Sequence, residues 1–511
     1  MRVRVDWRAS VSLTGRILKY LSVAFLVPIA VSLLYSQQDL LVFVATMAGT
    51  VTAGALLERV GPAEDPGPRE AFLMVGLTWL LVAVVGAAPY VLAGSGTVAS
   101  PVNALFESMS GFTTTGATVM RDISVDAHSR ELMMWRQLTQ WLGGMGIVVL
   151  AVAILTELSV GGAQLMEAEA PGPGIEKLTP QIAETARALW LAYIGFSVAQ
   201  AVLLYLLGVS GLAPEMTAYG AIAHTFTTMP TGGFSPQARS IEAFSWAVQW
   251  AIIPFMVVAG TNFVLFWHVL TGDWREAVED SEVRFYAGCL ASLSAIVSVL
   301  LFVDNALVDA ENVGRVAGLV EPSIRHAAFQ IVSIVTTTGY ASMNFDVWSP
   351  PAQYVLVFAM FLGGSAGSTG GGIKMIRWLV ILKSIRRELF TTVHPEAVRP
   401  VRLAGRSLDE NAVRGIYTFT LLYFVVFLVG TLLLAVDAAR VGGIGIEVIG
   451  LVTATAATLG NIGPGLGMVG PMGNYLQFPW SSRLLMVGLM WIGRLEIFPV
   501  LVLLTRAFWR S

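Results

Sequence analysis

Ten apolar runs, each long enough to cross a lipid bilayer, limit what this 511-residue chain can fold into. A helix that spans the hydrocarbon core needs about 20 predominantly apolar residues. Each run has at least 18 residues and few charged side chains. The sequence therefore predicts an all-α polytopic membrane protein. The runs are Ile17–Leu34, Leu40–Leu57, Ala71–Leu92, Met133–Leu155, Leu189–Val209, Trp246–Leu270, Tyr286–Val303, Tyr354–Leu382, Tyr417–Val436 and Arg483–Leu504.

The composition excludes most other classes of protein. Charged residues make up 13% of the chain, against roughly 25% in an ordinary soluble domain. The single cysteine, Cys289, leaves no internal disulfide, and one Cys with five His does not favour a clustered metal site. The formal net charge of −3 argues against a nucleic-acid partner. The runs hold no Asp and no His at mid-depth, so we do not expect an enzyme.

Lys and Arg between the runs are distributed unevenly. With both termini in the cytoplasm, 20 of them fall on the cytoplasmic side and six on the opposite side, as the positive-inside rule requires. The basic N-terminus precedes an 18-residue apolar run without a convincing cleavage site, so we expect an uncleaved first span rather than a secretory signal. The sequence predicts a multi-pass protein with two cytoplasmic termini.

Four shorter segments begin as plausible helices and end in stretches too polar or too rich in Gly and Thr to span. Irregular backbone is tolerated at membrane depth only where protein buries it or where it lines a water-filled cavity. We therefore interpret the segments as re-entrant from the outside. They are Pro101–Thr118, Thr217–Ser235, Ser323–Ser342 and Ile444–Gly467.

These segments recur at a nearly fixed period. With Gly116, Gly232, Gly339 and Gly463 taken as equivalent, the intervals are 116, 107 and 124 residues, which is typical of internal repeats. Because two predicted spans separate successive segments, four parallel repeats around one axis are expected. The repeats are predicted in residues 71–158, 186–271, 284–388 and 412–511, after an extra N-terminal helix pair in residues 1–70.

Four such loops around one axis favour a cation pore. Their backbone carbonyls can replace the water shell of a cation, and Gly permits backbone angles that a Cβ penalises. No acidic ring lines the loops, so selectivity is expected from the oxygen cage. The alternative is that Gly and Thr clusters only pack helices together, which explains one loop better than four. The candidate selectivity filter comprises Thr114, Thr115, Gly116, Thr231, Gly232, Thr337, Thr338, Gly339, Asn461, Ile462 and Gly463.

Several long strings resemble the potassium-transporting subunit of the Trk/Ktr/HKT superfamily, and the TrkH type in particular. The resemblance covers essentially the whole chain. It implies four M1–P–M2 units around one pore, subunits paired as a homodimer, and potassium uptake into a bacterial or archaeal cell across its cytoplasmic (inner) membrane. The strings are WRQLTQWLGGMGIVVLAVAIL (135–155), PQIAETARALW (180–190), GGSAGSTGGGIKMIR (363–377), LGNIGPGLG (459–467) and GRLEIFPVLVLLTRAFWR (493–510).

One filter position per repeat separates the potassium-selective members of this family from sodium-permeable ones, which carry serine in the first repeat. The matching residues here are Gly116, Gly232, Gly339 and Gly463. The resemblance therefore implies potassium over sodium. The fourth loop, GNIGP at 460–464, departs from the Thr-Thr-Thr-Gly pattern, which leaves its carbonyl geometry least defined.

A glycine-rich run, here called the glycine loop (residues 363–372), interrupts the apolar run 354–382 near its middle. Six of its ten residues are Gly, and each costs a helix about 1 kcal/mol relative to Ala. The family resemblance implies an intramembrane loop that blocks the ion path and moves on activation. The alternative is a kink that packs against neighbouring helices. The candidate gate comprises Gly363, Gly364, Gly367, Ser368, Thr369, Gly370, Gly371, Gly372, Lys374 and Arg494.

Arg494 is the most informative charged residue, because an arginine inside a span is a candidate functional residue by default. Two interpretations are open and can hold together: a cation that binds carbonyls of the glycine loop and holds the gate shut, and a structural pair with a carboxylate such as Glu496. Lys374 and Arg377 either face the cavity or begin the cytoplasmic end. Glu107 is interpreted as a hydrogen-bonded brace of the first re-entrant helix.

His224 and His326 occur in the second and third re-entrant helices, where packing or capping roles are expected.

A second function is compatible with the same sequence, namely potassium symport coupled to Na+ or H+. Coupling favours buried carboxylates along the path, and few occur, chiefly Glu107 and Glu496. No cofactor is expected in this chain, since GGSAGSTGGGIK lacks the strand that a phosphate-binding loop follows. The expected partners are membrane lipid and, from the resemblance, a cytosolic ring of TrkA-like nucleotide-binding regulatory subunits. The loops Gly161–Arg187 and Lys383–Arg414 are candidate docking surfaces.

Overall fold

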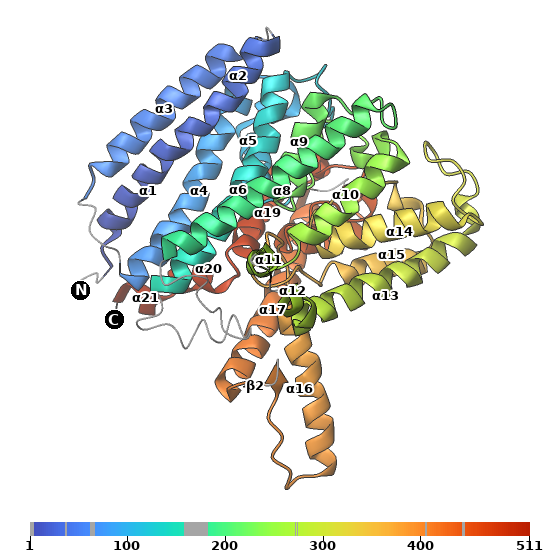
Figure 1. Cartoon of the computed structure of the whole chain (residues 1–511). Helices are drawn as coiled ribbons and strands as arrows, with labels where there is room; N and C mark the ends of the chain where they lie inside the picture. The colour runs from blue at the N-terminus through green and yellow to red at the C-terminus, as the bar shows by residue number, and fades with distance from the viewer. Residues whose placement is uncertain are drawn as a thin grey trace.

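The computed structural model describes residues 5–35, 38–61, 67–157, 182–270, 272, 274–403, 406–441 and 445–510. Its described part is almost entirely helical (Figure 1). The predicted docking loop 161–187 lies largely outside these residues. An N-terminal hairpin comes first, in which α1 packs along α3. It consists of α1 (Trp7–Leu21), η1 (Ser22–Phe25), α2 (Leu26–Tyr35) and α3 (Leu40–Glu58).

After the hairpin, a long helix, a short helix, a loop and a further helix follow one another four times. The first group is α4 (Pro68–Ala93), η2 (Gly96–Ala99), α5 (Pro101–Phe112) and α6 (Arg130–Glu157). The second is α8 (Ile182–Val209), α9 (Ala218–Thr228), η4 (Ser240–Ala243), α10 (Trp246–Ala259) and α11 (Phe263–Leu270), followed by α12 (Trp274–Glu279).

The third and fourth groups have the same order, and a short antiparallel hairpin joins them. The third group is α13 (Ser281–Val303), η5 (Asn305–Leu307), α14 (Val320–Val335), η6 (Phe345–Val347), α15 (Pro350–Ala359) and α16 (Met375–Val393). The hairpin is β1 (Arg402–Leu403) and β2 (Arg406–Ser407). The fourth group is α17 (Glu410–Val441), α18 (Val448–Leu459), η7 (Gly467–Val469), η8 (Tyr475–Gln477), α19 (Trp480–Arg494), α20 (Phe498–Leu503) and α21 (Arg506–Arg510).

Local sequence explains where several of these helices begin. Pro101 opens α5 and Pro350 opens α15. Pro is favoured in the first turn of a helix because the N–H that it lacks would have no acceptor within the helix there. The Thr217 hydroxyl caps α9 by accepting from Gly220 N, and the Asp280 carboxylate caps α13 by accepting from Val283 N.

Six helices of the described chain are long and apolar enough to cross a membrane. The expectation of ten continuous spans is therefore wrong in part. The run 354–382 is broken between Ala359 and Met375, as the glycine loop predicts, but 246–270 and 483–504 are broken as well. In the first, Gly260 packs so closely on Tyr286 and Thr336 that a Cβ would clash. In the second, Glu496 and Ile497 have left-handed backbone angles.

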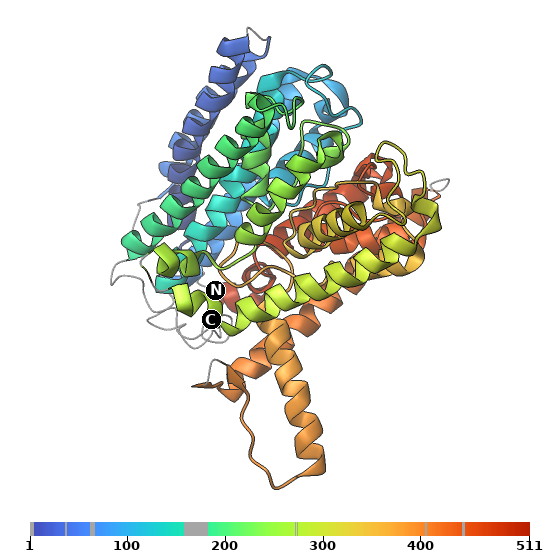
Figure 2. The ribbon, with the colours of Figure 1, turned by 45° about the vertical axis from the view of Figure 1, so that its right-hand side comes forward.

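Helices of successive groups pack against one another in order. The helix that closes one group contacts the short helix of the next: α6 packs on α9, and α10 packs on α14. The last group returns to the first, because α19 packs on α5. Figures 1 and 2 show α13, α14 and α15 side by side and the long projection that α16 and α17 form below them. The groups therefore surround a common centre.

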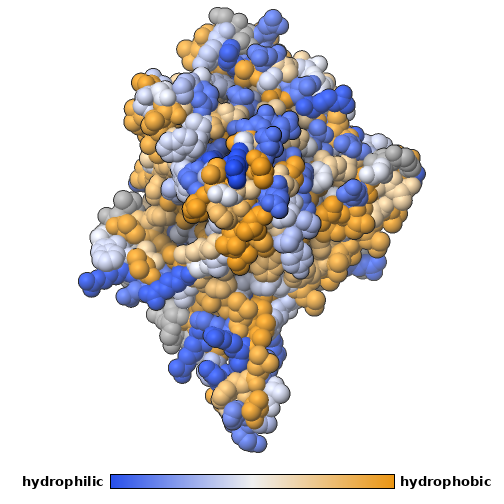
Figure 3. All heavy atoms as spheres, turned by 90° about the vertical axis from the view of Figure 1, so that its right-hand side faces the viewer, coloured by the Kyte–Doolittle hydropathy of each residue, from blue (hydrophilic) through white to orange (hydrophobic). Residues whose placement is uncertain are grey.

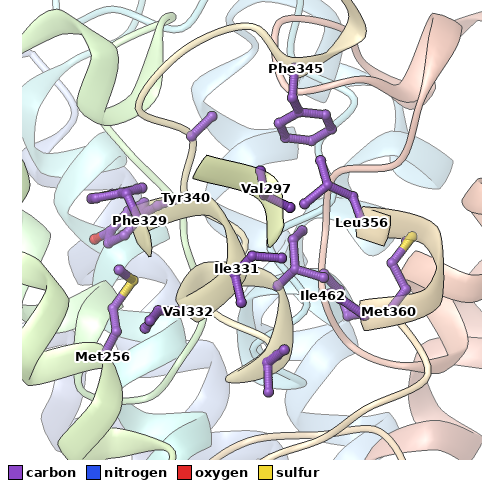
Figure 4. Close-up of a cluster of buried hydrophobic side chains, with 14 of the residues drawn as sticks. Met256, Val297, Phe329, Ile331, Val332, Tyr340, Phe345, Leu356, Met360 and Ile462 are labelled. Carbon is purple, nitrogen blue, oxygen red and sulfur yellow. The ribbon is translucent and has the colours of Figure 1, made fainter. Parts of the chain in front are cut away.

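The apolar core reaches that centre. Figure 4 shows Ile462, a predicted filter residue, among Ile331, Leu356 and Met360 in one buried cluster. The outer face is also apolar: on the side seen in Figure 3, apolar residues dominate the middle and polar residues gather toward the top and on the projection. An apolar surface between polar ends suits a protein whose solvent is lipid.

Candidate functional site

The four predicted filter loops share an unusual backbone conformation. In each loop a non-glycine residue has a positive φ, between 53° and 61°, which is uncommon for residues with a Cβ. Two residues later comes a glycine whose φ lies between 75° and 99°. The first set is Thr114, Thr231, Thr337 and Asn461, and the second is Gly116, Gly233, Gly339 and Gly463.

Hydrogen bonds place the loops in the same register. In the first loop, the amides of Thr115 and Gly116 both donate to Ser110 O, at 2.8 and 3.5 Å. In the second, the amides of Gly232 and Gly233 both donate to Thr227 O, at 2.8 and 3.2 Å. The third and fourth loops repeat the pattern with Ser333 O and Ala457 O.

The predicted alignment of the second repeat is therefore wrong by one residue. Gly233, rather than Gly232, occupies the position of Gly116, and Gly232 occupies that of Thr115. The dipeptide Thr231-Gly232 matches Thr115-Gly116 in sequence. Because Gly232 and Gly233 are adjacent, the sequence does not show which of them is equivalent to Gly116. The backbone shows which glycine has the left-handed angle that favours a residue without a Cβ.

The loops contact one another in a closed ring. A Cβ built on Gly116 would lie 2.2 Å from Gly232 O, in the next loop. The same construction gives 1.9 Å from Gly233 to Thr338 O and 1.9 Å from Gly339 to Ile462 O. It gives 2.6 Å from Gly463 back to Thr115 O in the first loop. Only glycine permits these approaches, and no gap separates the fourth loop from the first.

Polar side chains of the short helices hold the chain where it leaves the ring. The Glu107 carboxylate accepts hydrogen bonds from Thr118 Oγ1 (2.8 Å) and Val119 N (2.9 Å), and pairs with Arg136 Nε at 2.7 Å. Both charged side chains are buried. The interpretation of Glu107 as a brace agrees with these contacts.

Equivalent braces occur in the next two groups. His224 and Gln330, like Glu107, lie nine residues before the ring glycine of their loop. His224 Nε2 contacts Ser235 Oγ at 3.1 Å, and Gln330 Nε2 donates to Tyr340 O at 3.1 Å. His326 Nδ1 contacts Ser342 Oγ at 2.9 Å. Both histidines therefore have local structural partners, as expected.

Removing the Glu107 carboxylate should destabilise the fold strongly. Glu107→Ala leaves the buried Arg136 without its ion-pair partner, and breaking a buried pair in this way costs about 3–5 kcal/mol. The urea midpoint of unfolding in detergent should fall clearly. Glu388→Ala is the matched control, because Glu388 is exposed and its partner Arg387 keeps a second carboxylate, Glu410, and exposed pairs contribute about 0–1 kcal/mol. Equal midpoints for the two variants would contradict the bracing role.

A cavity of about 110 Å³ lies on the side of the ring where the loops lead away from the short helices. The ring glycines of all four loops line it, together with Arg121, Arg136 and Tyr475. No Asp or Glu occurs among its described lining residues.

The glycine loop contacts the opposite side of the ring, where the short helices end. Gly371 N donates to Thr337 Oγ1 in the third filter loop at 2.7 Å. Thr369 Oγ1 donates to Met229 O, at the end of the second short helix, at 3.1 Å. A Cβ on Gly371 would lie 2.5 Å from Gly460 O in the fourth group. The glycine loop therefore contacts the second, third and fourth groups where their short helices meet the filter loops.

Two buried cations bind successive carbonyls of the glycine loop. Arg494 Nη1 donates to Thr369 O at 2.8 Å, and Lys374 Nζ donates to Gly370 O. Arg494 Nη2 also reaches Gly143 O in α6, at 3.3 Å. Of the two interpretations of Arg494, the carbonyl contact is the one observed.

In the described chain no hydrogen bond or salt bridge joins Arg494 to Glu496. Glu496 instead binds Arg377 Nη2 at 2.6 Å. Arg377 is buried and stacks over the Phe419 ring at 3.7 Å, so it lies inside the fold rather than at an exposed helix end.

Two further residues of the site were not predicted. Gln140 in α6 donates to Gly232 O at 2.7 Å and accepts from Phe234 N at 3.1 Å, so it holds the second filter loop. Glu282 in α13 contacts the glycine loop. Gln140 lies within the quoted string WRQLTQWLGG and is polar in an apolar run, which is a usable signal.

Comparisons with known proteins agree with this geometry. The family model described as "TrkH: Cation transport protein" matches residues 42–510. The chain is 38% identical to the Trk system potassium uptake protein TrkH of Halomonas elongata, over 99% of both proteins. It is 36% identical to the protein of that name from Escherichia coli, over 99% of this chain and 100% of that protein.

A solved structure is similar in fold. The crystal structure of the potassium transporter TrkH from Vibrio parahaemolyticus matches with a TM-score of 0.84 at 33% sequence identity. The match covers 99% of this chain and 100% of that one.

Proposed function

Because the chain belongs to the TrkH family of cation transport proteins, we propose that it takes up K+ across the cytoplasmic membrane through a K+-selective pore. The observation that carries this proposal is the closed ring of four loops with matching left-handed positions. The four helix groups are then M1–P–M2 repeats with the boundaries expected from the sequence, and α5, α9, α14 and α18 are the pore helices. Relatives named as potassium uptake proteins support K+ as the ion.

The chemistry of the ring suits a cation without any bound cofactor. Carbonyl oxygens of the filter loops replace the hydration shell of K+. The pore helices α5, α14 and α18 end at Phe112, Val335 and Leu459, immediately before the loops. Their C-terminal ends carry partial negative charge, which favours a cation at the ring.

Replacing Gly116 by Ser should admit Na+. The new Cβ and hydroxyl would press on Gly232 O, which a Cβ at this position approaches to 2.2 Å, and φ of +80° strains any residue except glycine. The ring then distorts, and the K+/Na+ permeability ratio from reversal potentials should fall. Gly195→Ser is the control, because a Cβ on Gly195 meets no neighbouring atom. An unchanged ratio for Gly116→Ser would count against the filter assignment.

The glycine loop is the proposed gate. It lies beneath the ring and is held by Arg494 and Lys374 through the carbonyls of Thr369 and Gly370. Flexible backbone at this depth is tolerated beside an ion pathway. Opening then requires the loop to leave these cations, a change that a cytosolic nucleotide-binding ring of TrkA type would control.

A homodimer in a bacterial or archaeal inner membrane, with both termini cytoplasmic, belongs to the same proposal. The projection formed by α16 and α17, which includes the basic loop 383–414, is the proposed docking surface for the regulatory ring (Figure 1). Arg387 pairs there with Glu410 at 2.8 Å.

Flux measurements in liposomes that contain only this chain test the function. A selective pore predicts K+ flux that follows its own electrochemical gradient at clamped voltage. A symporter predicts no flux until Na+ or H+ is supplied. The two carboxylates considered for coupling, Glu107 and Glu496, are each paired with an arginine, which favours the pore. Flux that requires a second ion would overturn it.

A further inference from the structure

Glu282 is a buried carboxylate to which the pore and gate described above assign no role. It is the second residue of α13 and is only 6% exposed. It does not cap this helix, since the Asp280 side chain already does so. No described residue forms a salt bridge with it. A buried carboxylate without a cation is costly unless strong hydrogen bonds compensate, so its actual partners are informative.

Those partners are two backbone amides of the glycine-loop region. Glu282 Oε1 accepts from Ala366 N at 2.8 Å and from Ile376 N at 3.1 Å. Ala366 lies inside the glycine loop, and Ile376 lies in the first turn of α16 just after it. A single oxygen atom of α13 therefore binds the chain on both sides of the segment 367–375.

This contact complements those of the two cations. Arg494 and Lys374 bind carbonyl oxygens in the middle of the loop, at Thr369 and Gly370. Glu282 binds amide hydrogens on either side of that middle. Each of these hydrogen bonds stabilises the loop, so all three side chains favour the same loop position.

We propose that Glu282 is a positioning residue of the gate, which holds the glycine loop beneath the ring until the channel is activated. The proposal rests on the proposed role of the loop as the gate. Loss of the Glu282 carboxylate releases Ala366 and Ile376 together. The loop then leaves the ring more often, even though Arg494 and Lys374 are intact.

The test reads loop position separately from ion flux. Cys289 is the only cysteine, so Cys289→Ser gives a background in which Ser368→Cys is a single reporter thiol. Ser368 is buried in the loop, at 4% exposure. Adding Glu282→Ala should speed maleimide modification of this thiol about tenfold or more, given the loss of two hydrogen bonds. Basal K+ flux in liposomes should rise in parallel.

Glu279→Ala is the matched control. Glu279 is three residues away and exposed, and its removal should leave both the modification rate and the flux at the parent's values. Glu282→Gln keeps the oxygen but not the charge and should give an intermediate rate. If Glu282→Ala does not fold, judged by size exclusion, the Gln variant decides in its place.

The outcomes separate the two proposals. A modification rate equal to the parent's overturns the role of Glu282, whatever the flux does. Faster modification with unchanged flux supports Glu282 as the loop's anchor and overturns the loop as the gate. Faster modification with raised K+ flux supports both.

Discussion

Replacing Gly233 by Ala should reduce K+ flux in liposomes to that of protein-free vesicles. Gly233 has φ of +75°, and a Cβ there would lie 1.9 Å from Thr338 O in the neighbouring loop. A left-handed residue with a Cβ costs about 1–2 kcal/mol, and the overlap with a backbone oxygen adds to it. The ring cannot keep its closed geometry, because Thr338 O belongs to the backbone and has no side-chain freedom with which to move.

Two other glycines provide comparisons for this result. In Gly232→Ala the new Cβ meets the Gln140 side chain rather than backbone, so this variant should retain more flux than Gly233→Ala. Gly288→Ala, in a span where a Cβ meets no neighbouring atom, should conduct normally. If Gly232→Ala were the more harmful substitution, the register found in the second loop would be wrong.

Replacing Arg494 by Ala should raise basal K+ flux in the absence of any regulatory subunit. Arg494 binds the glycine loop at Thr369 O and α6 at Gly143 O, so its removal frees the middle of the loop. Each lost bond from a charged donor contributes about 1.5–3 kcal/mol, which corresponds to at least about a tenfold change in the closed-to-open ratio. Flux by fluorescence quenching in liposomes measures the effect.

One control keeps a positive charge at position 494, and the other removes an arginine that does not contact the glycine loop. Arg494→Lys retains one donor and should leak less than Arg494→Ala. Arg506→Ala changes an exposed arginine beyond the span and should behave like the parent. A deletion within residues 368–371 should also raise basal flux. If both the deletion and Arg494→Ala conduct like the parent, the glycine loop is not the gate.

Much of this architecture follows from local sequence. The period of the Gly-rich and Thr-rich segments predicts four similar loops, because the same backbone angles require the same residue types. Six glycines in residues 363–372 predict the broken helix, and α15 does end at Ala359. The arginine inside an apolar run leaves two partners open, a carbonyl of the glycine loop and Glu496, and Arg494 donates to Thr369 O.

The rest depends on contacts between distant residues. Adjacent Gly232 and Gly233 leave the register of the second loop ambiguous until Thr227 O is seen to accept from both amides. The break after Ala259 lies between two apolar segments, and it brings Gly260 against Thr336, a contact that the sequence does not show. Glu282 lies 84 residues from Ala366, so no local pattern could have indicated its role.

The most direct test of the central claim is to locate a bound cation. Rb+ replaces K+ and scatters anomalously, so crystals of this chain grown in Rb+ would show where the ion resides. A pore predicts an anomalous peak on the axis of the ring, among the carbonyls around Gly116, Gly233, Gly339 and Gly463. A peak elsewhere, with none at the ring, would contradict the claim that these four loops carry the ion.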